Sequence, residues 1–247
     1  LILAVALNGA GYHLTNQWDF WVFPDRPAPT MNAVADPEAL KLVGGRYTQL
    51  KPLADAPDTK LRIVRTLTKS DLKHLTDGGD VLLLGAKPFP ANATRFQIGV
   101  AGRAHMNLAT VIQPHPALKY LPNAGWCDWQ FHNLLEHGEC IEFNKIPAPF
   151  DPIVEIVSSY KYIRLQTAMW EARTDGGRLF VASFNFQMDD PAAVALLDGM
   201  LEYCQSSLFQ PRSTISITDT LTPVLQGVQF KSLRGNDGNF YPGKSIF

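Results

Sequence analysis

The stretch Asp80-Val81-Leu82-Leu83-Leu84-Gly85 decides the fold of this chain. Its central residues are all aliphatic, so neither face of the segment is suited to water, and a glycine ends the run. A short continuous apolar run of this kind is typical of a strand buried on both faces, and such strands lie in the middle of parallel sheets. The stretch therefore predicts an α/β fold, in which helices flank a mostly parallel sheet.

The sequence before this strand alternates between helix and strand signals. Asp36-Pro37 places a capping aspartate and a proline at the start of a helix, which Gly44-Gly45 ends. Leu61-Arg62-Ile63-Val64 is predicted to be the next strand. Ser70 is predicted to cap a short helix that runs to Leu75. These elements supply the helices and the neighbouring strand that a buried parallel strand requires.

The later sequence predicts a second hairpin and then a helix. Residues 162–173 alternate between apolar and polar side chains, Gly176-Gly177 turns the chain, and residues 178–185 are again rich in apolar residues. Asp190-Pro191 repeats the capping signal, and apolar residues recur after it at helical spacing. Residues 36–210 are therefore predicted to form one α/β domain whose sheet has an antiparallel edge.

The first 24 residues predict a β-hairpin. Residues 1–7 are apolar, Gly9-Ala10-Gly11 forms the turn, and Trp18-Asp19-Phe20-Trp21-Val22-Phe23 is the expected second strand. Two strands are only marginally stable alone, so the hairpin must pair with further strands or pack on the rest of the molecule. Because the chain starts inside an apolar run, we expect it to have been cut from a longer polypeptide.

Residues 25–35 are predicted to form a linker, and residues 211–247 a tail. The closely spaced prolines that begin at Pro24 lack amide donors and have a fixed φ, which disfavours regular structure. In the tail, residues 214–218 could add a strand, and the remainder is expected to be loop.

Charge and composition argue against several partners and cofactors. The chain has 22 basic and 23 acidic side chains and a net charge of −1, so neither nucleic acid nor an anionic membrane is an expected partner. The apolar run at residues 1–7 is far too short to span a bilayer. The three cysteines form no CxxC pair and the six histidines are dispersed, so no metal site is predicted. Neither GxGxxG nor GxxxxGKS/T occurs, and we predict no cofactor.

One segment resembles the start of a nucleophile loop. In Gly125-Trp126-Cys127-Asp128-Trp129 a cysteine follows a glycine closely, as in the strand-to-helix elbow of class I glutamine amidotransferases. Such an elbow needs a small residue two positions after its nucleophile, and Trp129 would clash there. An active thiol also needs a histidine base, and His132 is near in sequence but forms no His-x-Glu pair. We predict no catalytic residue, with Cys127 and His132 as the candidates if the chain were a cysteine-dependent amidase.

Three tryptophans are candidates for binding or interdomain contact. Trp126 and Trp129, together with Trp170, could stack on sugar rings as in a carbohydrate-binding module, or they could lie in the core. Burying an indole removes about 150–250 Å² of surface from water, which favours burial unless a ligand or a neighbouring domain covers the ring. Packing or interdomain contact is therefore preferred, and oligosaccharide binding remains the alternative.

Four segments in the same order resemble a C-terminal region of large bacterial glycoside hydrolases of family 2, the β-galactosidase-like kind. They are residues 16–24, 125–131, 152–154 and 170–183, and the resemblance extends over about residues 8–210. It implies that residues 1–24 are the remnant of a preceding β-sandwich, and that residues 36–210 form an α/β domain similar to flavodoxin and to class I glutamine amidotransferases.

The resemblance also implies a division of labour. The catalytic glutamates of that family lie on a (β/α)₈ barrel upstream of such a region, and no residue of this chain matches their motif. We therefore expect an accessory domain that contacts other domains of its parent chain or a second subunit in a homo-oligomer. The parent would hydrolyse glycosidic bonds of complex plant or host glycans, as a periplasmic or secreted bacterial protein.

Overall fold

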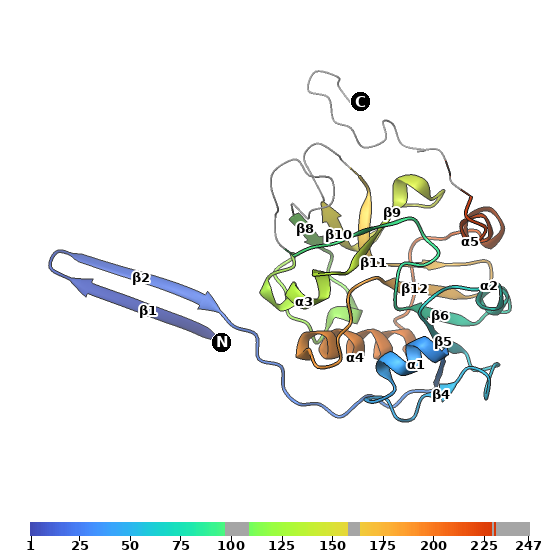
Figure 1. The fold of residues 1–247 in the computed structure, drawn as a ribbon, viewed down its shortest axis with the longest axis horizontal. Coiled ribbons are helices and arrows are strands. Elements are labelled where there is room, and N and C mark those ends of the chain that lie inside the picture. Colours follow the sequence, from blue (N-terminus) through green and yellow to red (C-terminus); the bar gives the residue numbers. More distant parts are fainter. Residues whose placement is uncertain (97–108, 158–163, 229, 231–247) are drawn as a thin grey trace, which may run out of the picture.

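The fold is a mixed sheet flanked by helices, with a separate antiparallel hairpin at the N-terminus (Figure 1). The structure, a computed structural model, describes residues 1–96, 109–157, 164–228 and 230. Among these residues, no helix has the length and apolar content needed to cross a bilayer.

Within the described ranges the sheet has ten strands, of which eight form a continuous path. Its five parallel strands are, in spatial order, β4 (Lys51–Pro52), β3 (Ala33–Ala35), β5 (Leu61–Val64), β6 (Asp80–Leu83) and β12 (Arg178–Ala182). The path continues through antiparallel pairs to β11 (Gln166–Arg173), β10 (Pro152–Val157) and β8 (Ala109–Ile112). Off this path, β9 (Glu139–Glu142) pairs with β11 and with β7 (Ala91–Ala93). The sheet is thus mixed, and its antiparallel part is larger than the single edge predicted.

Helices cover both faces of the sheet. The larger core cluster includes residues of α1 (Pro37–Val43), α3 (His132–Leu135) and α4 (Pro191–Gln205), and the second cluster includes residues of α2 (Lys69–Thr76) and α5 (Thr222–Leu225). Short 3-10 helices occur at η1 (Pro116–Leu118), η2 (Trp129–Phe131) and η3 (Phe143–Lys145), and a π-helical turn at η4 (Ile217–Leu221).

The prediction for the central strand is confirmed. All residues of β6 are buried, and β6 lies between β5 and β12, with both pairings parallel. Leu82 packs in the cluster with α1 and α4, whereas Val81 and Leu83 pack in the cluster with α2 and α5. The continuous apolar run therefore supplies both cores, as expected for a strand buried on its two faces.

The helix starts are confirmed for α1 and α4 but not for α2. Asp36 Oδ1 accepts a hydrogen bond from the Ala39 amide at 2.7 Å, and Asp190 Oδ1 caps α4 in the same way. By contrast, α2 begins at Lys69 and Ser70 lies inside it. Thr68 is the N-cap, because its amide donates to Asp71 Oδ2 at 2.9 Å in a capping box. Ser70 instead accepts a hydrogen bond from Arg62.

The predicted second hairpin is confirmed, and the possible strand at 214–218 is limited to a single bridge. β11 and β12 pair with Arg173 opposite Arg178. After Thr214, which makes a single bridge to Arg173, the chain turns into η4. The reason is local, since the Ser216 side chain accepts from the Asp219 amide and starts a helical turn.

The N-terminal hairpin is present with a different second strand. β1 (Ile2–Gly9) pairs with β2 (Tyr12–Asp19), so β2 begins directly after the turn at Gly11, whose φ is 89°, and ends where the aromatic strand was expected to begin. Every residue of both strands is exposed, and the hairpin projects away from the body of the molecule (Figure 1).

The connector, residues 20–32, lacks regular structure but is tied to the body. Arg46 Nη2 donates to the Arg26 carbonyl at 3.1 Å, and the Arg26 guanidinium lies 3.9 Å from the centre of the Tyr120 ring. Gln49 Nε2 donates to the Pro29 carbonyl at 2.7 Å. The chain then enters the sheet as β3, inside the range predicted to be linker. The connector is therefore anchored to the body at several points.

Candidate functional site

Cys127 lies on an ordinary backbone rather than on a strained elbow. Gly125 carries the positive φ of this loop, 93°, and among the described non-glycine residues only His137 has a positive φ. The Cys127 amide donates to Thr110 Oγ1 at 2.8 Å, and its side chain packs against the larger core cluster. Burial raises the pKa of the Cys127 thiol to about 12, against a smaller lowering effect of the Thr110 hydrogen bond. The reactive thiolate is therefore a very minor species at neutral pH.

His132 takes no part in activating this thiol. Its ring stacks near the indole of Trp129, with ring centres 6.0 Å apart and planes 22° apart, and its Nδ1 lies 2.9 Å from Asn133 Oδ1. Across the described part of the chain, no hydrogen bond or ion pair joins Cys127 to a histidine. Cys127 and His132 are thus close in sequence, but they do not form a pair of nucleophile and base.

Trp126 and Trp129 are exposed to 51% and 59%. Asp128 sets this arrangement, because its side chain accepts from the Trp129 amide at 2.8 Å and starts η2. Phe131, two residues on, is fully buried against the core, so Trp129 is left at the surface. The indole of Trp129 lies against Phe96, with ring centres 5.0 Å apart.

Trp170 has a different environment from the other two indoles. It is 2% exposed and packs edge-on between Phe89 and Phe143, with ring centres 5.5 and 5.0 Å away. A ligand or a neighbouring domain cannot reach this ring unless the core opens. Trp170 is therefore a core residue in this structure and does not belong to the surface that holds Trp126 and Trp129.

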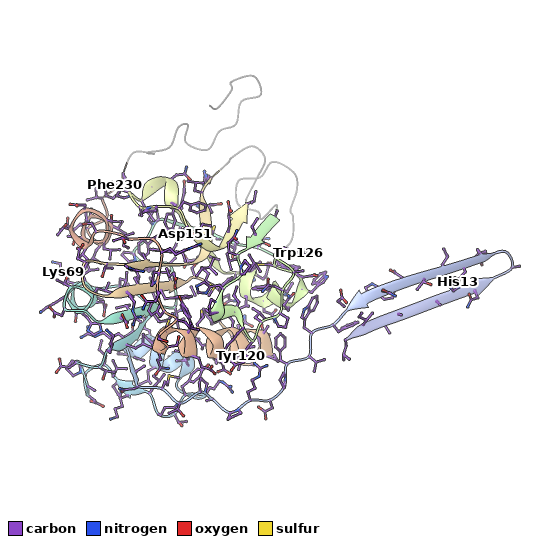
Figure 2. The ribbon with its side chains drawn as sticks, turned by 180° about the vertical axis from the view of Figure 1, so that it is seen from behind. His13, Lys69, Tyr120, Trp126, Asp151 and Phe230 are labelled. Atoms are coloured by element: carbon purple, nitrogen blue, oxygen red, sulfur yellow. The ribbon has the colours of Figure 1, made fainter. Side chains whose placement is uncertain are left out.

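An aromatic groove lies where the connector meets the loop around Cys127. It consists of two adjoining hollows of about 540 and 480 Å³, which share the residues Asp19, Phe20, Trp21, Phe23 and Gln130. The first hollow is also lined by Trp126, Asn123 and Asp128, and the second by Trp18, Trp129, Asn133 and Asp190. Figure 2 shows Trp126 at the side of the body from which the connector leads to the hairpin, on which His13 is labelled.

Gln130 is the most buried polar side chain of the aromatic groove. Its residue is 7% exposed, and its Nε2 donates to the Pro122 carbonyl at 2.6 Å. Its Oε1 is buried without a hydrogen-bond partner in the described part of the molecule. A buried acceptor left in this state is costly, which makes this atom a candidate contact for a ligand donor.

The hairpin presents a second surface, its apolar face. Directly paired residues share a face, so Leu3 and Trp18 lie together, as do Leu7 and Leu14. The apolar face is defined by five side chains, each 45–59% exposed: Leu3, Val5, Leu7, Leu14 and Trp18. The apolar face also carries Asn16, and the opposite face carries Ile2 together with Ala4, Ala6, His13, Thr15, Gln17 and Asp19 among others. One face of the hairpin is therefore suited to burial and the other to water.

The sequence alone pointed to Trp126 and Trp129 but missed four other residues of the aromatic groove. Trp18, Phe20 and Trp21 were read as part of a strand, and Gln130 was passed over. Their aromatic character was visible, but nothing in the sequence shows that residues 18–23 fold back beside residues 122–133. Within the described ranges, no group of three or more histidine, cysteine, aspartate or glutamate side chains could hold a metal ion.

The fold and these surfaces define an α/β domain that carries an exposed hairpin and an aromatic groove. A family model described as a domain of unknown function (DUF8487) matches residues 62–224, more than half of the chain, and the chain belongs to this family. The match runs from β5 to α5, and the hairpin and connector lie outside it. No curated protein matches the chain.

Proposed function

We propose that this chain is a non-catalytic accessory domain of a glycoside hydrolase similar to the β-galactosidase-like family 2 enzymes. Its role in this proposal is to hold a neighbouring β domain of the same polypeptide through the hairpin. The observation that carries the proposal is the apolar face, which is exposed along the whole hairpin. The parent enzyme would hydrolyse glycosidic bonds with residues outside this chain.

The order of the parallel strands supports the proposed likeness to flavodoxin and to class I glutamine amidotransferases. Numbered along the chain, the five strands lie in the order 2-1-3-4-5. This is the flavodoxin-like order, and in such sheets ligands bind beyond the carboxyl ends of the strands, where the strand order reverses. In this chain that point is occupied by Asp36, whose Oδ2 accepts from the Arg65 amide at 2.8 Å and whose Oδ1 caps α1. Both oxygens of the carboxylate are thus engaged in holding the fold.

The surroundings of Cys127 support a non-catalytic role. A cysteine nucleophile requires a lowered pKa or an adjacent base. Here burial raises the pKa of the thiol, and the nearest candidate base in sequence, His132, stacks with Trp129 instead.

The hairpin supports docking on energetic grounds. Two strands are marginal without further contacts. Covering the five half-exposed side chains of the apolar face would contribute on the order of 5 kcal/mol, at the usual value for buried apolar surface. The connector adds to this, because the contacts of Arg26 with Arg46 and Tyr120 hold the connector on the body and reduce the entropy that docking would cost. A β domain that offers its own apolar sheet face fits these properties.

The proposal is tested by placing charge on one face of the hairpin in the longer polypeptide. Val5→Asp with Leu7→Asp alters the apolar face, and Thr15→Asp with Gln17→Asp adds the same charge to the opposite face. The first pair should lower the melting temperature of the neighbouring domain by several degrees and reduce glycoside hydrolysis, since buried charge is costly. The second pair should change both little. Equal effects of the two pairs, or none, would contradict docking through the apolar face.

A separate assay tests the non-catalytic role. The isolated chain should release no ammonia from glutamine and should not cleave chromogenic glycosides. Glutamine hydrolysis that disappears in Cys127→Ser would show that the chain is an amidase.

A further inference from the structure

We propose that the aromatic groove is a binding site for an uncharged oligosaccharide. This goes beyond the accessory role, because docking of a neighbouring domain on the hairpin requires no ligand. Four of the five residues of the apolar face, all except Trp18, lie outside the lining of the groove. A neighbouring domain that covers these four residues leaves the groove open, and Trp18 then lies at the border between the two surfaces.

The two exposed indoles supply the stacking surfaces. A sugar ring has a face of C–H groups that packs on an aromatic ring, and about half of the surface of Trp126 and of Trp129 is open. Trp129 is also held in place, since Phe96 and His132 both lie against it. A ring that is fixed before the ligand arrives loses little entropy on binding.

Gln130 supplies a built polar contact. It lines both hollows, it is 7% exposed, and the hydrogen bond to Pro122 fixes its amide so that Nε2 is used and Oε1 is not. Because Oε1 is itself buried, the proposal requires the Gln130 side chain to turn this atom toward the groove when a sugar hydroxyl offers it a donor. The indoles would select the ring face, and Gln130 would select a hydroxyl at its edge.

The charges of the lining select against anionic ligands. The residues that line the two hollows include Asp19, Asp128 and Asp190 together with Asn123 and Asn133, and none of the described lining residues is a lysine or an arginine. Phosphorylated, sulfated or uronic sugars would be repelled, whereas neutral hydroxyl groups find acceptors.

The size of the groove indicates more than one sugar unit. Hollows of about 540 and 480 Å³ each have the volume of a small-molecule site. Because the hollows share five lining residues, one linear chain could cross both and place one ring on each exposed indole.

The test is a titration of the full 247-residue chain with neutral linear hexasaccharides, in which binding is measured by calorimetry and by tryptophan fluorescence. The probes are cellohexaose, xylohexaose and mannohexaose. At least one should bind at millimolar or lower concentration and change the fluorescence. Trp126→Ala and Trp129→Ala should each weaken that binding about tenfold, because the stacking contact and its apolar burial are lost. Leu208→Ala, an equally exposed apolar site outside the lining, should not change it.

Two further arms complete the test. Hexagalacturonate should bind more weakly than the best neutral probe. Gln130→Met should weaken the binding of that neutral probe. Both tryptophan variants should keep the melting temperature of the unmodified chain. The proposal is overturned if no neutral hexasaccharide binds at millimolar concentration, or if binding survives both tryptophan substitutions. It is also overturned if only a cationic or proline-rich peptide binds in the groove.

Discussion

β6 and β1 are both rich in aliphatic residues, yet one lies at the centre of the molecule and the other outside it. Val81, Leu82 and Leu83 of β6 are fully buried between two parallel neighbours. Leu3 and Leu7 of β1 are 49% and 59% exposed, although their side chains are no less apolar. The difference is one of partners, because β6 has sheet on both sides and helices on both faces, whereas β1 pairs with β2 alone among the described strands.

The residue patterns of the two strands show how many covered faces each strand is suited to. β6 is apolar at consecutive positions, as a strand covered on both faces must be. β1 and β2 alternate, with five large apolar side chains and Asn16 on one face and, apart from Ile2, mainly small or polar side chains on the other, which is typical of a sheet with one covered face. The hairpin therefore has the pattern of a packed strand pair without the layer that would pack on it, and this difference underlies the docking proposal.

The largest expected difference between the body of the molecule and the hairpin is in the reactivity of a cysteine thiol. The pKa of Cys127 is about 12, so its thiolate fraction at neutral pH should be about a thousandfold below that of an exposed cysteine. Iodoacetamide should therefore label Cys127 very slowly at neutral pH, while a cysteine introduced as Thr15→Cys on the hairpin should react at the ordinary rate. Mass spectrometry of timed samples gives both rates in one protein. Fast labelling of Cys127 below neutral pH would mean an activated thiol.

The second difference is in the cost of cavities. Leu82→Ala in β6 should lower the free energy of unfolding by about 4 kcal/mol, because the site is fully buried in the larger core cluster. Leu7→Ala, the same chemical change on the hairpin, should stay within about 0.5 kcal/mol in the isolated chain. Urea denaturation measures both. Similar losses would show that the hairpin packs on the body in solution and is not free.

The connector joins the two regions, and its ties are testable. Asp198 is 2% exposed in α4, where it pairs with Arg46 at 2.6 Å and accepts from the Tyr47 hydroxyl at 2.7 Å. Asp198→Ala should cost about 3 kcal/mol, because the buried Tyr47 hydroxyl and the partly exposed Arg46, which also holds the connector, both lose their carboxylate. Limited proteolysis near Arg26 should become faster as well.

The control for this prediction is Asp189→Ala, an exposed carboxylate that lines, together with Asp198, a third hollow beside the connector. It should change the stability by less than about 0.5 kcal/mol. Unfolding curves in urea that superimpose for the two variants would show that the pair formed by Asp198 and Arg46 does not stabilise the body.

The elements that the sequence predicted are those with a local signal. The aspartate and proline pairs at Asp36-Pro37 and Asp190-Pro191 mark helix starts by short-range hydrogen bonds, and both starts are confirmed. The central strand was predicted from its composition alone. Ser70 failed as a cap because a competing local signal, the reciprocal pair of Thr68 and Asp71, is the stronger one.

The elements that were missed depend on distant partners. β3, β7 and β9 are short, and each is a strand only because a remote segment pairs with it. The same holds for the candidate site. Trp126 and Trp129 were recognisable as residues, but their exposure and the burial of Trp170 depend on packing that begins with Asp128 in one case and with Phe89 and Phe143 in the other.

The central claim is that the apolar face of the hairpin is covered by a neighbouring β domain, and amide hydrogen exchange tests it most directly. The exchange rates of residues 2–9 and 12–19 are measured by mass spectrometry in the isolated chain and in the longer polypeptide that we propose. The account predicts rapid exchange in the isolated chain, where two exposed strands open easily, and strong protection in the longer polypeptide. Equally rapid exchange in both would contradict it.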